Sequence, residues 1–137
     1  MDTIIHNIFR AQDECTLILA ELLKVLAQER LSLIRLEINE ISESTRLKEI
    51  LGAQLRQKIT RLNRLIEGNF NSAVHLEGTM TEMEEARWKS SRHEFWKNYE
   101  ELKGLCEMNQ QFLKSSLRNL STLSDQDRKS TRLNSSH

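Results

Sequence analysis

A single apolar stripe from Phe95 to Leu123 constrains the fold more than any other feature of this chain. Its members are spaced three and four residues apart, so they fall on one face of a helix. They are Phe95, Tyr99, Leu102, Cys106, Leu113, Leu117 and Leu120. Asn109 stands where the spacing calls for another apolar residue. A polar residue in such a seam costs stability and usually fixes register or presents a surface to a partner.

The rest of the chain has the composition of long helices. It contains no proline and only four glycines in 137 residues, so little interrupts the backbone. Hydrophobic residues make up 38% and charged residues 29%, which is typical of amphipathic helices rather than sheets. A chain of this length corresponds to one small domain. We therefore expect a single all-α domain.

Two further long helices are predicted, from about residue 3 to 35 and from about residue 38 to 66. The first has two parallel apolar rows, and this breadth fits a helix with two neighbours better than a two-stranded zipper. The rows are Ile4, Ile8, Ala11, Cys15, Ile18, Leu22 and Val25, and Ile5, Phe9, Leu19, Leu23 and Leu26. The second helix has one row, from Leu47 to Ile66, and the segment Gly68–Ser72 is expected to end it.

The third helical region, about residues 80–124, has two candidate starts. Thr81–Glu84 and Ser91–Glu94 each match a capping box, in which two side chains satisfy free backbone amides reciprocally. We expect a short first segment, a weak point near Ser90–Ser91, and a main helix over residues 92–124. The three regions together predict an elongated antiparallel three-helix bundle with coiled-coil-like packing.

The last eleven residues, Asp127 to His137, differ from the rest. The stripe ends there, and the string matches one translation frame of a common sequencing-library adapter. A natural polar tail is the alternative interpretation. We expect residues 127–137 to be non-native, so that the helical domain comprises residues 1–126 and the natural protein continues differently beyond them.

Charge and hydropathy exclude several classes of function. The net charge is zero, which removes the main electrostatic reason to expect nucleic acid or an anionic membrane as a partner. The longest apolar region, Thr16–Ala27, contains Glu21 and Lys24 and cannot span a bilayer. The N-terminus lacks the basic start of a secretion signal. Cys15 and Cys106 both lie on apolar stripes and are expected to be buried, reduced thiols in a cytoplasmic protein.

No catalytic, metal-binding or cofactor-binding site is predicted. His6, His75 and His93 share no helix turn with one another or with a cysteine. The chain has no Glu-x-x-His pair and no glycine-rich phosphate loop. After His93, the nearest lysine, Lys97, is one residue too late for a phosphotransfer bundle and no glycine follows it. We therefore expect a protein that is not an enzyme.

The second helix also has a basic strip. Its members are Arg46, Lys48, Arg56, Lys58, Arg61 and Arg64. It is either a binding surface or a solvated face balanced by acidic residues of neighbouring helices. No aromatic residues alternate with these bases, as single-stranded nucleic-acid binding would prefer, so the second interpretation is favoured.

Two segments resemble the FlgN family of flagellar export chaperones. In Glu29–Leu51 the chain follows the family's order of a glutamate, a leucine four residues later, a turn, leucines at helical spacing, and a lysine before another leucine. The matching residues are Glu29, Leu33, Glu37, Ile38, Ile41, Lys48 and Leu51. It departs at Leu36, where the family often has the turn glycine, and at Ser44, where it often has leucine.

The second segment lies in the opening stripe, where the family has Leu, then Asn-x-x-Asn, then a leucine-rich run. Leu105, Asn109 and the leucines at 113, 117 and 120 match this order, and Phe112 takes the place of the second asparagine.

The resemblance implies a cytoplasmic chaperone without catalysis. Its clients would be the hook-associated, or hook–filament junction, proteins, bound through their disordered C-terminal segments before the flagellar type III export apparatus takes them over. The implied partner-binding residues are Leu105, Asn109, Phe112, Leu113, Leu117 and Leu120. Two alternatives stay open. The leucines are intramolecular core, or the chain is a structural coiled-coil module of unrelated role that associates with itself.

Overall fold

The computed structural model describes residues 2–135, and this range is entirely helical apart from short connections. Its helices are α1 (Asp2–Arg35), α2 (Ile38–Phe70), α3 (Ala73–Thr79) and α4 (Glu82–Ser135). The predicted all-α class is confirmed for this range. Met1, Ser136 and His137, which belong to the predicted domain and tail, lie outside the described residues.

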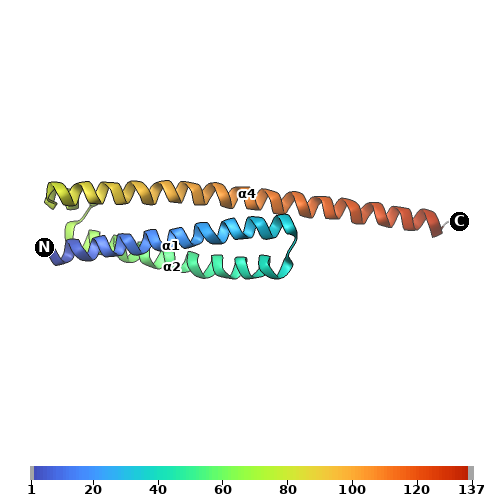
Figure 1. Ribbon diagram of the computed structural model, residues 1–137, viewed down its shortest axis with the longest axis horizontal. Coiled ribbons are helices and arrows are strands. Elements are labelled where there is room, and N and C mark those ends of the chain that lie inside the picture. The colour runs from blue at the N-terminus through green and yellow to red at the C-terminus, as the bar shows by residue number, and fades with distance from the viewer. Residues whose placement is uncertain (1, 136–137) are drawn as a thin grey trace.

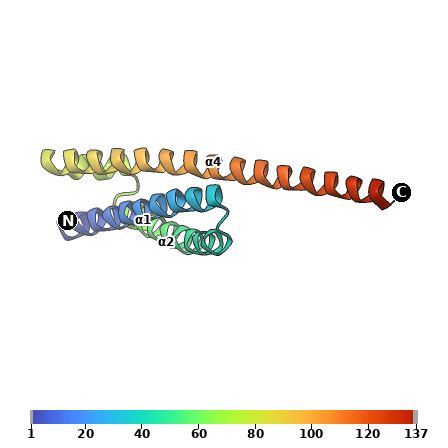
Figure 2. The same cartoon turned by 45° about the vertical axis from the view of Figure 1, so that its right-hand side comes forward.

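Helix α1 is the central element of the molecule. α2 packs back along it in the opposite direction, and α4 packs along it in the same direction (Figures 1 and 2). α2 and α4 scarcely approach each other directly. α4 has 54 residues and α1 only 34, so α4 continues past the α1–α2 turn as a single projecting helix. We call residues 113–135 of α4, which include this projecting part, the arm.

The core lies where α2 and α4 meet α1, and α3, which packs on α2, adds to it. Both predicted rows of α1 contribute to it, and Ile8, Leu19 and Leu26 have no exposed surface. The other helices add Leu55, Leu62, Ile66, Phe70, Leu76, Trp88 and Phe95. A fully buried leucine contributes roughly 2 kcal/mol through removal of apolar surface from water. The two apolar rows predicted for the first helix are therefore explained by its two packing partners, α2 and α4.

The α1–α2 turn places a leucine in the left-handed region. Leu36 has φ 55°, and its amide donates to the Leu33 carbonyl at 3.3 Å. The Glu37 amide donates to the Ser32 carbonyl at 3.0 Å, so the two bonds form a Schellman motif. This motif prefers glycine at the left-handed position, because a side chain there meets the backbone. Leu36 is thus a strained residue at a glycine position.

Leu36→Gly is expected to raise the free energy of unfolding by about 0.5–1 kcal/mol, because it relieves the left-handed strain. Little burial is lost, since Leu36 is 65% exposed. Urea denaturation followed by circular dichroism measures the change. Leu17→Gly is the matched control, because Leu17 is equally exposed at 65% but lies inside α1, where glycine costs about 1 kcal/mol. Equal losses in both variants would show that Leu36 is not strained.

α2 ends four residues beyond the predicted boundary at about residue 66, and its end lies within the segment Gly68–Ser72 that was expected to stop it. The helix runs on through Gly68 and ends at Phe70, where Asn71 takes φ 67° and its amide donates to the Glu67 carbonyl at 3.2 Å. Asparagine rather than glycine therefore ends the helix. Phe70 is buried, and this burial favours the additional helical turn.

Between the second and third predicted helical regions the structure has a further short helix, α3. Ser72 caps it by accepting a hydrogen bond from the His75 amide at 3.2 Å. Leu76 of α3 is completely buried against the core and explains why this segment is ordered as a helix.

The start of α4 confirms one capping box and not the other. The Thr81 amide donates to Glu84 at 2.9 Å, and the Glu84 amide donates to the Thr81 hydroxyl at 3.2 Å. The predicted weak point at Ser90–Ser91 is wrong, because α4 is continuous from Glu82. Buried Trp88 and Phe95 hold the helix on both sides of the serines. α4 also extends to Ser135, beyond the predicted end at 124. The non-native origin of residues 127–137 stays a prediction.

Candidate partner-binding site

The six residues predicted to bind a partner separate into two groups. Leu105 is half-buried and Asn109 is 4% exposed, and both lie where α4 still packs on the bundle. The other four are exposed at the start of the arm or just before it. They are Phe112 (38%), Leu113 (43%), Leu117 (58%) and Leu120 (56%).

Asn109 connects the three long helices. Its Nδ2 donates to the Leu26 carbonyl at 3.1 Å and to Glu29 Oε1 at 3.0 Å. The other carboxylate oxygen of Glu29 accepts a hydrogen bond from Lys48 Nζ at 2.8 Å. We call Glu29, Lys48 and Asn109 the polar triad. The amide nitrogen of Asn109 is used within the chain, and its buried oxygen has no hydrogen-bond partner in the described part of the chain. Because the residue is 4% exposed, its contacts support a role in fixing register, not direct contact with a partner.

The arm presents a row of uncovered leucines. Leu113, Leu117 and Leu120 are four and three residues apart, so they share one face of α4. We call these three residues the arm strip. Figure 1 shows that the C-terminal part of α4 extends past the ends of α1 and α2, so no helix of the described chain covers that part.

The α1–α2 turn adds exposed apolar side chains at the same end of the bundle. Ile34 (54% exposed), Leu36 (65%) and Ile38 (78%) surround the turn. Between α1 and α4, a hollow of about 280 Å³ is lined by Arg30, Met108, Gln111, Phe112 and Ser115. We did not predict these turn residues as binding residues from the sequence. Their position, close to a predicted turn and outside the apolar rows, was the feature that indicated them. Grouped exposed apolar residues of this kind commonly mark interaction surfaces.

The basic strip on α2 is only partly neutralised. Three of its six members form ion pairs, namely Arg46 with Glu43 (2.6 Å), Lys48 with Glu29 (2.8 Å) and Lys58 with Glu14 (3.0 Å). Two of these partners, Glu14 and Glu29, lie on α1, so the predicted balance by neighbouring acids holds for part of the strip.

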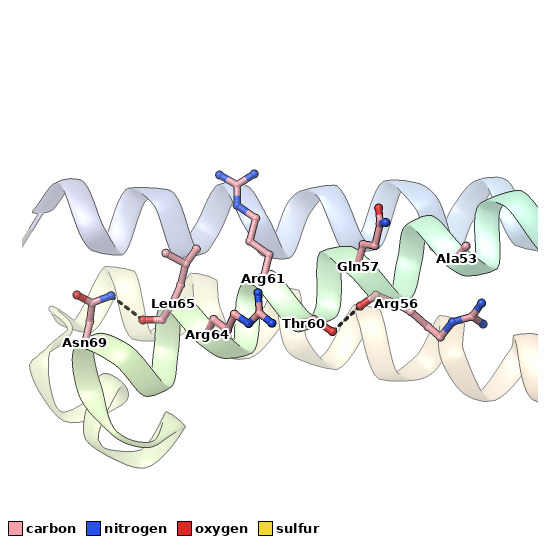
Figure 3. Close-up of a pocket in the computed structure, with 8 residues that line it drawn as sticks. All are labelled: Ala53, Arg56, Gln57, Thr60, Arg61, Arg64, Leu65 and Asn69. Atoms are coloured by element: carbon pink, nitrogen blue, oxygen red, sulfur yellow. Dashed lines mark hydrogen bonds between the residues drawn. The ribbon is translucent and has the colours of Figure 1, made fainter.

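Arg56, Arg61 and Arg64 form no ion pair among the described side chains. Figure 3 shows their guanidinium groups spread in different directions along one side of α2, around a shallow hollow of about 730 Å³. The hollow is also lined by Ala53, Gln57, Thr60, Leu65 and Asn69. The side chains diverge instead of converging on a common point, so the arrangement is that of a solvated face.

The histidines and cysteines form no chemical centre in the part of the chain that the structure describes. His6, His75 and His93 are exposed, and no group of three or more potential metal ligands comes together among the described residues. Cys15 and Cys106 are free thiols, the first buried and the second half-buried, and burial raises the pKa of both. None of the helices, within the residues searched, is long and apolar enough to cross a membrane.

Comparisons of the chain with protein-family models, with curated proteins and with solved structures find no match.

Proposed function

We propose that this protein is a cytoplasmic export chaperone of the FlgN type, which binds the C-terminal segments of hook–filament junction proteins before the flagellar export apparatus takes them over. The observation that carries the proposal is the arm strip, a row of exposed leucines near the point where α4 projects beyond α1 and α2. The chemistry required is non-covalent binding, which needs neither a catalytic residue nor a cofactor.

The arm strip suits one kind of client segment, an amphipathic helix. Such a helix places apolar residues at every third and fourth position, and this spacing matches that of Leu113, Leu117 and Leu120. A client segment that is disordered when free orders on binding and hides its apolar residues from other molecules. Ile34, Leu36 and Ile38 are further exposed apolar residues, at the α1–α2 turn.

The bundle acts in this proposal as the support for the arm. We propose that α1, α2 and α4 form an elongated antiparallel three-helix bundle with coiled-coil-like packing. The polar triad joins these helices one to two turns before α4 leaves α1. A binding surface is more effective when rigid elements hold it in place. The three triad residues are also among those that carry the family resemblance.

A second candidate function is a structural module that associates through its arms. The four–three spacing of the arm strip also fits a coiled-coil seam between two copies. The two functions differ in what covers the strip, so a single set of variants separates them.

The test uses the full chain and peptides from the C-termini of junction proteins encoded in the same genome. The triple variant Leu113→Ser/Leu117→Ser/Leu120→Ser is expected to weaken peptide binding by about tenfold or more, since loss of central apolar anchors removes most interface energy. Calorimetric titration measures the affinity. Circular dichroism is expected to show a folded bundle, because the strip is exposed.

The control variant carries three serines in place of Leu17, Val74 and Met83, which are 65%, 80% and 85% exposed and lie off the arm. It should bind the peptides as the unaltered chain does. Absence of binding by the unaltered chain, or equal binding by both triple variants, contradicts the chaperone function. Sedimentation that shows a dimer lost only in the arm variant, without peptide binding, supports the self-associating module instead.

A further inference from the structure

A cleft lies between α2 and α4, above α1, and exists because α2 and α4 pack on α1 without closing on each other. Its volume is about 240 Å³. The lining residues are Gln12 and Cys15 of α1, Ile59, Leu62 and Asn63 of α2, and Arg92, Phe95, Trp96 and Tyr99 of α4. We call it the α2–α4 cleft. It lies away from the arm, and the proposed function makes no use of it.

The floor of the cleft contains a polar group without a partner. Gln12 is 1% exposed, and its Oε1 accepts a hydrogen bond from Arg92 Nη1 at 3.3 Å. Its Nε2 has no hydrogen-bond partner in the described part of the chain. A buried donor left unpaired costs about 1–3 kcal/mol, so buried amides in folded proteins are normally satisfied by protein, water or ligand. The Nε2 group of Gln12 is therefore a buried hydrogen-bond donor that lacks an acceptor.

Arg92 adds a positive charge without a close counter-ion. No described carboxylate lies within ion-pair distance of its guanidinium, which stacks over Trp88 at 5.5 Å and over Trp96 at 5.8 Å. Burial lowers the pKa of Arg92, while Cys15 and Glu77 act in the opposite direction. A half-buried cation of this kind gains most from an anion that forms charge-assisted hydrogen bonds with it.

The α4 wall of the cleft is aromatic. Phe95, Trp96 and Tyr99 form a contiguous group, with the Trp96 ring centre 5.7 Å from that of Phe95 and 5.5 Å from that of Tyr99. Trp96 is 49% exposed, so part of its ring is free to meet another molecule. A planar ring placed against this wall gains edge or stacking contacts in addition to burial of its area.

We propose that the α2–α4 cleft binds a small aromatic carboxylate. The carboxylate accepts hydrogen bonds from the Arg92 guanidinium and from Gln12 Nε2, both of which line the cleft. The ring lies against Trp96 and Tyr99. The volume is below the range of about 300–1,000 Å³ for sites of drug-sized ligands, so the ligand has a single ring.

Benzoate is the probe. Two compounds of similar size are the controls: benzylamine, which is positively charged, and benzyl alcohol, which is uncharged. The full chain is labelled with ¹⁵N, and each compound is titrated while the Trp96 indole and Gln12 side-chain amide signals are followed. Benzoate is expected to shift both signals and to saturate. Benzylamine is expected to shift neither.

Arg92→Met should weaken benzoate binding by about tenfold, because a charge-assisted hydrogen bond is lost. Gln12→Leu should also weaken it, while Arg61→Met, which removes an exposed arginine of α2, should leave it unchanged. The proposal is overturned if benzoate shifts neither signal, if benzylamine binds as well as benzoate, or if both cleft variants retain full affinity. None of these results bears on peptide binding at the arm.

Discussion

Trp88→Ala is expected to lower the free energy of unfolding by about 3–5 kcal/mol, a large share of the stability of a single domain. Trp88 is 1% exposed and is the largest side chain of the core. Its ring centre lies 6.2 Å from that of Phe9 on α1, so it joins the start of α4 to the start of α1. Removing the indole leaves a cavity that the surrounding helices cannot fill without moving apart. Urea denaturation followed at 222 nm by circular dichroism measures the loss.

Trp96→Ala provides the matched control on the same helix. The same group is removed, but Trp96 is 49% exposed and leaves little cavity. Its expected cost is about 1 kcal/mol, from partial burial and from the aromatic contacts with Phe95 and Tyr99. Comparable losses in the two variants would contradict the placement of Trp88 in the core.

Trp88 also shows what limits a prediction of the fold from this sequence. It lies seven residues before Phe95, which lies seven before Leu102, so the stripe of α4 extends one heptad further toward the N-terminus. Two serines and a second capping box at Ser91–Glu94 indicated a break in the helix at this point. Burial of the side chains on both sides of the serines outweighs these local signals of helix initiation. The rows of α1 and α2, in contrast, were predictable because their apolar residues recur at helical spacing over most of each helix.

The candidate site was predictable only in part, because residues of the same apolar stripe are buried in one part of α4 and exposed in another. Phe95 packs in the core, whereas Leu117 has the same helical spacing and is exposed. What separates them is the point at which α1 ends beside α4, and this is a property of the assembled helices. The contact of Asn109 with Glu29 joins residues 80 positions apart and follows from the same assembly. The sequence marked Asn109 as unusual, and only the packing shows which groups it meets.

The second large effect on stability is expected from a substitution in the polar triad. Lys48→Met is expected to lower the free energy of unfolding by about 2–3 kcal/mol, because Glu29 loses the cation that compensates its buried charge. The Glu29 side chain is 6% exposed, and the Lys48 ammonium lies 2.8 Å from its carboxylate. The partial exposure of Lys48, 37% of its side chain, places the effect below that of a fully buried pair. Urea denaturation at neutral pH measures it.

The double variant Glu29→Met/Lys48→Met tests whether this loss comes from the uncompensated charge. It is expected to recover most of the lost stability, since apolar side chains of similar volume replace a buried ion pair at little cost. Asn109 Nδ2 keeps its hydrogen bond to the Leu26 carbonyl in this variant, so this donor is not left unpaired. A double-mutant cycle gives the coupling energy of the pair. A double variant less stable than Lys48→Met alone would contradict this explanation. It would show that Glu29 stabilises the bundle more through its hydrogen bond with Asn109 than through its ion pair with Lys48.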